Sequence, residues 1–205
     1  MTDKPFLYIL SIINVIMKTP RDRIVAAALR LFYTQGYLAT GINQIISESK
    51  VAKATFYNHF SSKENLCVAY LQARHIIWME WLKNSVENHT STEERLRGVF
   101  DFLREWMEGC NYRGCAFLNI ASEVPTLNNK IRAEVIKHKD DLKLYLRQMI
   151  SLLKSSRKRY KHINIEADTD MVYVLVEGAI VASQNYGEVW PIEVARKAAC
   201  KLLNI

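Results

Sequence analysis

The chain has 205 residues, of which 49% are hydrophobic and 24% charged, and it contains only seven glycines and four prolines. This composition indicates a globular protein with a sizeable core, and the lack of strand-like alternation between turns argues against a β fold. The formal net charge of +7 permits nucleic-acid binding without proving it, but the segment 18–66 alone holds seven basic residues against three acidic ones.

Residues 1–18 form an N-terminal extension with an apolar run from Phe6 to Met17. The run is too short to cross a bilayer, and it lacks the basic start and the cleavage site of a signal peptide. Two readings stay open. Either the natural start is Met17, directly before a capped helix, or the extension packs on the body or on a partner.

A first helix is predicted from Thr19 to Gly36, with Thr19 as N-cap, Pro20 at the first position and Gly36 at the end. Its buried stripe should consist of Ile24, Ala27, Ala28, Leu31 and Phe32.

Two short helices are predicted between Thr40 and Lys63. Thr40 should cap the first of them, and Phe56 and Phe60 should point the same way from the second. Helices of about two turns are not stable alone and need the preceding helix to pack on. The segment therefore predicts a helix-turn-helix, whose second helix can lie in a DNA major groove, although an ordinary helical hairpin would share this spacing.

The run from Val51 to Leu66, VAKATFYNHFSSKENL, resembles the DNA-binding signature of the TetR family of transcriptional regulators. Three positions depart from the family pattern: Lys50 stands where glycine is usual, Ala52 replaces a capping serine, and Ala54 replaces a frequent glycine. The resemblance implies an all-α protein with an N-terminal three-helix DNA-binding domain at residues 19–63 and a C-terminal helical ligand-binding and dimerisation domain at residues 64–205.

The resemblance and the polar residue types together predict the DNA contacts. Lys53 and Lys63 should meet phosphates, Thr55 and Tyr57 a phosphate or a thymine methyl, and Asn58 a base edge. The full predicted set is Thr40, Asn43, Lys53, Thr55, Tyr57, Asn58, His59 and Lys63.

Five body helices are predicted by apolar periodicity, caps and breaks. They run from Ser61 or Ser62 to about Asn88, Ser91 to about Glu108, Asn128 to about Lys154, Asp168 to about Tyr186, and Pro191 to Leu203. The segment from Gly114 to Glu123 resembles one found in a subset of the TetR family, and this resemblance implies a short helix beside the ligand pocket. Capping boxes are expected at Ser61-x-x-Glu64 and Ser91-x-x-Glu94, and the basic stretch 154–161 should be a solvated loop. The resemblance implies that the last two helices form a homodimer interface, whereas plain intramolecular packing is the alternative.

A ligand cavity is predicted in the body, because aromatic helices with a few polar groups suit an apolar site with orienting contacts. Its candidate residues are Trp78, Trp81, Phe102, Trp106, Phe117, Asn119, Glu123, His138, Tyr173 and Glu177. Glu123 and Glu177 each need an internal partner or a cationic ligand, so the expected inducer is aromatic or cationic and amphipathic. Ordinary core packing competes with this interpretation.

The four cysteines lack zinc-ligand spacing and are expected to be reduced thiols in a cytoplasmic protein, with Cys110 and Cys115 as a redox-sensing alternative. No catalytic, metal or phosphate-loop motif is present, so we expect no enzyme activity, cofactor, metal or membrane partner. The predicted function is a ligand-responsive regulator, usually a repressor, that binds a near-palindromic double-stranded DNA operator as a dimer and is released by a small-molecule inducer. The alternative is a small-molecule binding protein with a degenerate DNA-binding head.

Overall fold

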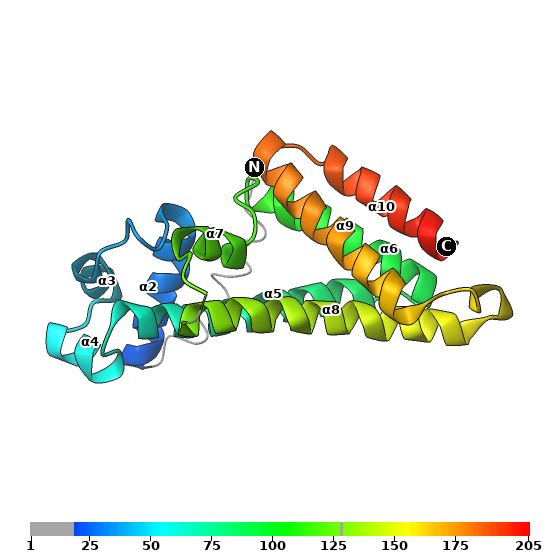
Figure 1. Cartoon of the computed structure of the whole chain (residues 1–205). Helices are drawn as coiled ribbons and strands as arrows, with labels where there is room; N and C mark the ends of the chain where they lie inside the picture. The colour runs from blue at the N-terminus through cyan, green and yellow to red at the C-terminus, as the bar shows by residue number, and fades with distance from the viewer. Residues whose placement is uncertain (1–18, 128) are drawn as a thin grey trace. The chain divides into compact units, whose positions relative to one another are not determined.

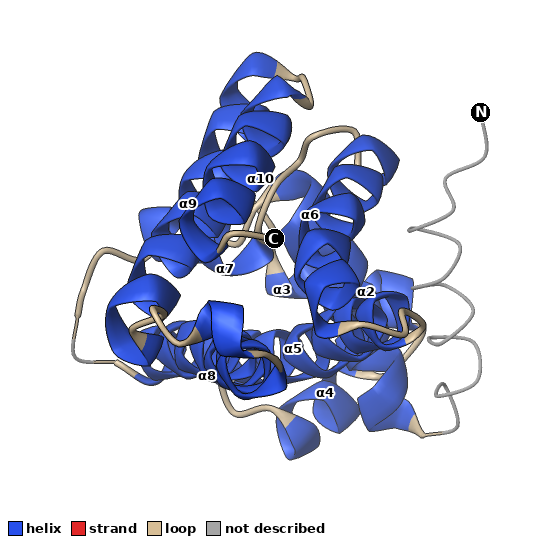
Figure 2. Cartoon of the chain, turned by 90° about the vertical axis from the view of Figure 1, so that its right-hand side faces the viewer, coloured by secondary structure: helices blue, strands red, loops and turns tan. Residues whose placement is uncertain are grey.

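The computed structural model describes residues 19–127 and 129–205, and the expectations for residues 1–18 lie outside this range. All regular structure in the described residues is helical, as Figure 2 shows, which confirms the all-α prediction. The helices are α2 (Pro20–Gln35), α3 (Ile42–Ser49), α4 (Lys53–His59), α5 (Lys63–Glu87), α6 (Thr92–Gly109), α7 (Ala116–Glu123), α8 (Lys130–Ser156), η1 (Lys158–Tyr160), α9 (Ile165–Tyr186) and α10 (Trp190–Leu203).

The chain divides into two compact units. Unit 1 comprises the described residues up to Trp78 together with Cys115–His138, and unit 2 comprises Met79–Gly114 together with Lys139–Ile205. Helices α5 and α8 contribute to both units. Unit 1 therefore holds α2, α3 and α4, which lie next to one another in Figure 1, and also the whole of α7. The predicted boundary at residue 63 separates a DNA-binding domain from a ligand-binding and dimerisation domain, and it stays a prediction.

Helix α2 begins and ends where the sequence predicts. The Thr19 hydroxyl accepts a hydrogen bond from the backbone N–H of Asp22, and the Asp22 carboxylate accepts one from the backbone N–H of Thr19. Gly36 ends the helix with φ 98°, a left-handed conformation in which glycine avoids the Cβ strain of other residues. The predicted stripe is buried.

The prediction that Thr40 caps α3 is wrong. Gly41 is the N-cap, and the Thr40 side chain is fully buried, with its hydroxyl donating to the backbone carbonyl of Gly36 at 2.6 Å. The chain changes direction between α2 and α3, and this hydrogen bond stabilises the turn that makes the change. Thr40 thus stabilises the head from inside.

The turn between α3 and α4 accommodates two of the three departures from the family signature, Lys50 and Ala52. Lys50 adopts the left-handed conformation, φ 53° and ψ 45°, although it carries a Cβ. Ala52 is the N-cap of α4 and offers no side-chain hydrogen bond to the helix. Phe56 and Phe60 are both buried, with ring centroids 6.2 Å apart, and they anchor α4 on its inner side as predicted.

The long helix α5 starts with a different cap from the predicted one. The backbone N–H of Asn65 donates to the Ser62 hydroxyl, so Ser62 takes the capping position, and Lys63 is the first helical residue. The predicted pair Ser61 and Glu64 falls out of register by one residue. The capping box of α6 is confirmed, because Ser91 and Glu94 exchange hydrogen bonds between side chain and backbone.

Unit 2 contains α6, α9 and α10, which pack on one another, with parts of α5 and α8. The prediction of a solvated loop at residues 154–161 is partly wrong. Lys154 lies in the last turn of α8, and Tyr160 on η1 is fully buried, with its hydroxyl donating to the Glu93 carboxylate at 2.8 Å. The basic residues around Tyr160 led to the prediction of a solvated loop, although the Tyr160 side chain itself is buried.

No helix in the described ranges is long and apolar enough to cross a membrane.

Candidate nucleic-acid interface

Helix α4 presents a polar face that is free of acidic side chains. Lys53, Asn58 and His59 are exposed, Tyr57 is 44% exposed, and Thr55 is half-buried. The opposite side carries Phe56, which is buried against the head. The helix is therefore anchored on its inner side, while the side chains predicted to bind phosphates and read bases lie on its outer side.

The charge beside this face comes from α2. The guanidinium of Arg21 lies 5.4 Å from the centroid of the Phe60 ring, so the first turn of α2 meets the C-terminal end of α4. Asn43, in the first turn of α3, is also exposed. These positions extend the cationic and polar surface from α4 to both neighbouring helices.

Two predicted DNA contacts are engaged inside the head. The Thr40 side chain is fully buried and does not reach the surface that DNA would contact. The Lys63 ammonium donates to the backbone carbonyl of Leu38 at 3.3 Å and lies 4.6 Å from the centroid of the Tyr37 ring. Partial burial lowers the pKa of this lysine. A phosphate would have to compete with these two contacts.

The predicted ligand residues divide between the two units. In unit 1 the structure brings together Trp78, Phe117 and His138. The Phe117 and His138 rings stack with centroids 3.7 Å apart, and Trp78 meets the same imidazole edge-on at 5.3 Å. Asn119, also in unit 1, is half-buried on α7. This cluster is a packed aromatic core within the unit.

Sequence reasoning missed one member of this cluster, His75. Its Nδ1 lies 3.0 Å from Nδ1 of His138, so one ring donates and the other accepts. His75 stands three residues before Trp78 on α5, and this helical spacing was the available signal.

In unit 2 the structure brings together Trp81, Phe102 and Trp106. Trp81 meets Phe102 edge-on at 5.1 Å, and Phe102 stacks on Trp106 at 6.4 Å. Tyr173 is half-buried on α9. Phe102 and Trp106 are among the most buried side chains of α6, as ordinary core residues also are.

Both predicted pocket carboxylates have partners within the protein. Glu123 accepts hydrogen bonds from the backbone N–H groups of Tyr37 and Leu38. Glu177 accepts two from the ammonium of Lys139, at 2.7 and 2.8 Å. Because both carboxylates are paired within the protein, neither requires a cationic ligand.

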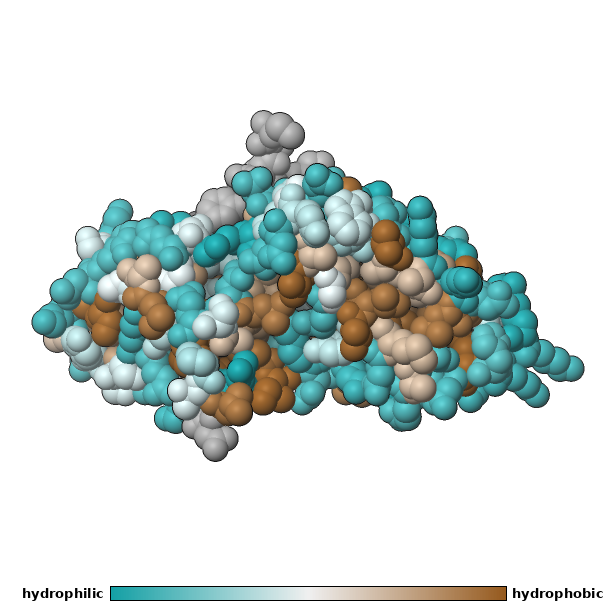
Figure 3. All heavy atoms as spheres, turned by 45° about the horizontal axis from the view of Figure 1, so that its top comes forward, coloured by the Kyte–Doolittle hydropathy of each residue, from teal (hydrophilic) through white to brown (hydrophobic). Residues whose placement is uncertain are grey.

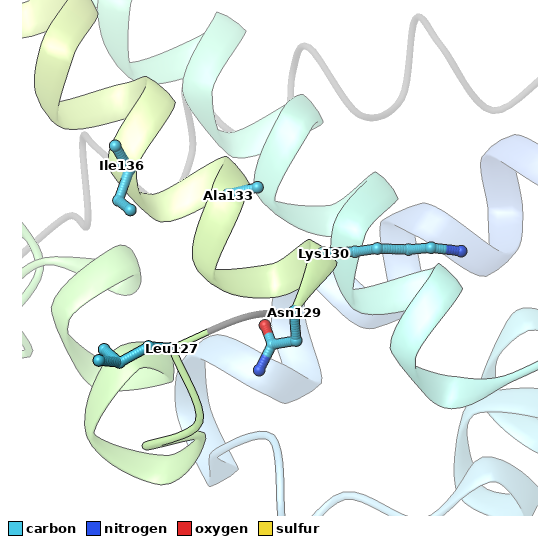
Figure 4. A pocket seen from close by; sticks show the side chains of 5 residues that line it. All are labelled: Leu127, Asn129, Lys130, Ala133 and Ile136. Carbon is cyan, nitrogen blue, oxygen red and sulfur yellow. The ribbon is translucent and has the colours of Figure 1, made fainter.

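An open pocket of about 490 Å³ lies where α8 begins, and none of the ten predicted ligand residues lines it. Figure 4 shows its lining, in which the Lys130 side chain points away from Leu127 and Ile136. The remaining lining residues are Asn129 and Ala133. No group of three or more metal-ligating side chains occurs among the described residues.

Family comparisons cover most of the chain. Residues 24–70 match the family model described as bacterial regulatory proteins of the tetR family, and residues 92–199 match the tetracyclin repressor-like C-terminal domain. The second match alone spans more than half of the chain. The chain belongs to the TetR family. It is accordingly a DNA-binding transcriptional regulator with an N-terminal helix-turn-helix and a C-terminal helical domain.

Individual relatives are named as HTH-type transcriptional regulators. An HTH-type transcriptional regulator of Lactococcus lactis is 27% identical over 67% of this chain and 71% of its own length. The regulators LmrA of Bacillus subtilis and QacR of Staphylococcus aureus are 37% and 35% identical. Those two alignments span 42% and 36% of this chain and less than half of each relative, at 44% and 40%.

Solved structures of TetR-family regulators share the fold. One from Streptomyces coelicolor has a TM-score of 0.78 and 24% identity, covering 90% of this chain and 94% of its own. Reduced NemR of Escherichia coli has a TM-score of 0.76 and 18% identity, covering 90% and 97%. The matched relatives are named as transcriptional regulators.

Proposed function

We propose that this TetR-family protein is a dimeric, ligand-responsive repressor in the cytoplasm, that it binds a near-palindromic DNA operator, and that it has no enzymatic activity. The observation that carries the proposal is the acid-free, outward-facing surface of α4 beside the N-terminal turn of α2. A helix with this surface can enter a major groove and place Asn58 at a base edge while Lys53 meets a phosphate.

The dimer proposal rests on an exposed apolar face formed by α9 and α10, the surface that the family resemblance assigns to the dimer. Figure 3 shows hydrophobic side chains gathered over these helices. Val174 is 65% exposed, and the neighbouring Gly178 has open space beyond its Cα. The other exposed apolar side chains of this face are Met171, Val181, Tyr186, Trp190 and Val194. Exposed apolar stripes of this kind mark protein interfaces, and a twofold axis would pair each helix with its own copy.

A small-molecule inducer remains part of the proposal. A ligand that prefers one arrangement of the protein shifts DNA binding by its differential affinity for that arrangement. The aromatic clusters around His138 and Phe102 are the candidate binding regions, one in each unit. The carboxylates Glu123 and Glu177 belong to internal contacts, so we expect an aromatic inducer without a required positive charge.

The DNA-binding test starts from a random-sequence library enriched with the full-length wild-type protein. The expected result is one near-palindromic consensus. Lys53→Ala should lower the magnitude of the salt slope of log Kd by about one unit for each lost phosphate contact. Lys158→Ala, which removes an exposed lysine from η1, is the matched control and should leave the slope unchanged. Failure to enrich any sequence would support the alternative of a binding protein with a degenerate head.

The dimer test is Val174→Glu, measured by analytical ultracentrifugation. A carboxylate at the centre of the apolar face should weaken dimerisation by at least about tenfold, because an unpaired charge would be buried. Leu152→Glu is the control, since Leu152 is 57% exposed but lies on α8. A Val174→Glu protein that dimerises as tightly as Leu152→Glu would place the interface elsewhere.

A further inference from the structure

Helix α7 is fastened at both ends, and both fastenings lie within unit 1. Near its N-terminal end the Phe117 ring stacks on His138 of α8, and both side chains are almost fully buried. At its C-terminal end the Glu123 carboxylate accepts hydrogen bonds from the backbone N–H groups of Tyr37, at 3.1 Å, and Leu38, at 2.6 Å. The six-residue step between the two positions corresponds to a rise of about 9 Å along the helix.

The segment held by Glu123 is the turn 36–40, which leads from α2 into α3. Inside the head, the Thr40 hydroxyl holds the Gly36 carbonyl and the Lys63 ammonium holds the Leu38 carbonyl. Glu123 adds a restraint from outside the three-helix head. The fit is close, because a Cβ added to Gly36 would lie 3.0 Å from Oε1 of Glu123. Helix α3 begins at Ile42, directly after this turn.

The placement of Glu123 does not serve α7 itself. A carboxylate in the last turn of a helix lies at the negative end of the helix dipole, where it is unfavourable. The last turn of α7 contains no basic residue to offset this charge. The two hydrogen bonds to the turn are charge-assisted, and bonds of this type are stronger than neutral ones. The negative charge of Glu123 is therefore stabilised by its two hydrogen bonds to the head and not by its own helix.

We propose that Glu123 is the positioning residue through which α7 sets the DNA affinity of α3 and α4. The carboxylate does not contact DNA; it restrains the turn from which α3 starts. Displacement of α7 at its Phe117 end, as by a ligand in the aromatic cluster, reaches the head through these two hydrogen bonds. The inference rests on the proposed DNA-binding function and names the route by which that function is regulated.

The experiment is a double-mutant cycle on the full-length protein, using the DNA sequence that the wild-type protein enriches. Kd is measured for the wild type, Phe117→Ala, Glu123→Ala and the double variant. We expect Glu123→Ala to weaken binding about tenfold, in line with the loss of charge-assisted hydrogen bonds. Phe117→Ala should change Kd about fivefold in the wild-type background and less than about twofold when Glu123 is absent, because the route is already cut.

Two further variants separate positioning from charge and from folding. Glu123→Gln keeps one carbonyl acceptor and should fall between the wild type and Glu123→Ala. Glu80→Gln removes an exposed carboxylate from α5 and should leave Kd unchanged. Hydrogen exchange should accelerate at the Tyr37 and Leu38 amides in both Glu123 variants, while amides in the middle of α8 keep their protection.

Each outcome decides between the alternatives. Additive effects of Phe117→Ala and Glu123→Ala on log Kd overturn the route through α7, while DNA binding by the wild type leaves the proposed function standing. Unchanged Kd for Glu123→Gln and Glu123→Ala also overturns it. If the wild type enriches no sequence at all, the proposed function fails and the inference fails with it.

Discussion

The left-handed Lys50 allows the energetics of the helix-turn-helix to be tested at one residue. Lys50 ends α3 with φ 53°, and its backbone N–H donates to the carbonyls of Ile46 and Ser47. A residue with a Cβ is disfavoured in this conformation by about 1–2 kcal/mol. Glycine removes that strain but gives the unfolded chain more freedom, which costs about 0.4–1 kcal/mol. The net expectation for Lys50→Gly is a stabilisation of about 0.5–1 kcal/mol.

For a chain of 205 residues, this gain corresponds to a rise in Tm of about 1–4 °C. The assay is thermal unfolding followed by circular dichroism at one protein concentration, so that dimerisation contributes equally to every sample. Lys50→Ala removes the same charge and keeps the Cβ, so it should not be stabilised. If Lys50→Gly melts no higher than Lys50→Ala, backbone strain at this turn is not a significant cost and the reasoning is refuted.

Two further predictions concern the N-cap of α4 and the burial of Cys67. Ala52→Ser should stabilise the protein by about 0.5–1 kcal/mol, because Ala52 already has the extended N-cap conformation, with φ −69° and ψ 150°, and lacks only the hydroxyl. Ala54→Ser, inside the same helix, should not raise Tm, and equal melting of the two variants would count against the cap. Burial raises the pKa of the Cys67 thiol to about 12, so at pH 8 the folded protein should alkylate with iodoacetamide at Cys110 well before Cys67. Mass spectrometry of the labelled peptides checks the order, which unfolding in guanidinium should abolish; Cys67 reacting first would contradict it.

Periodicity and caps predicted most helix positions, because both depend on neighbours in sequence. The failures occurred where two adjacent residues could serve the same role. Thr40 and Gly41 are both acceptable N-caps, as are Ser61 and Ser62, and the path of the turn decided between them. Sequence reasoning had no means of placing the Thr40 hydroxyl against the Gly36 carbonyl. It also overlooked the burial of Tyr160, whose hydroxyl donates to Glu93, 67 residues away.

The exposure of the proposed DNA contacts on α4 was predictable, because a short helix with one aromatic face buried has only its other side left for solvent. Lys53, Tyr57 and Asn58 all lie on that side of α4. The sequence could not decide between a ligand site and a core for the predicted ligand residues, since an aromatic side chain has the same pattern in a packed core and in a pocket. The carboxylates show the limit most clearly. Glu123 accepts hydrogen bonds from backbone N–H groups 85 and 86 residues away, and no local sequence pattern predicts partners at that separation.

The fastening of the turn 36–40 by Glu123 also bears on the engineering of chimeric regulators. A head transplanted on the boundaries of its family model would end at residue 70 and leave α7 behind. The grafted turn would then depend on the host protein to supply a carboxylate in register with the Tyr37 and Leu38 amides. In a host without that acceptor, the grafted DNA-binding head would fold but its helix α3 would be less restrained. The DNA affinity of the chimera would then differ from that of both parent proteins. The exchangeable module in this protein is discontinuous, and a successful graft has to carry residues 115–138 with the head.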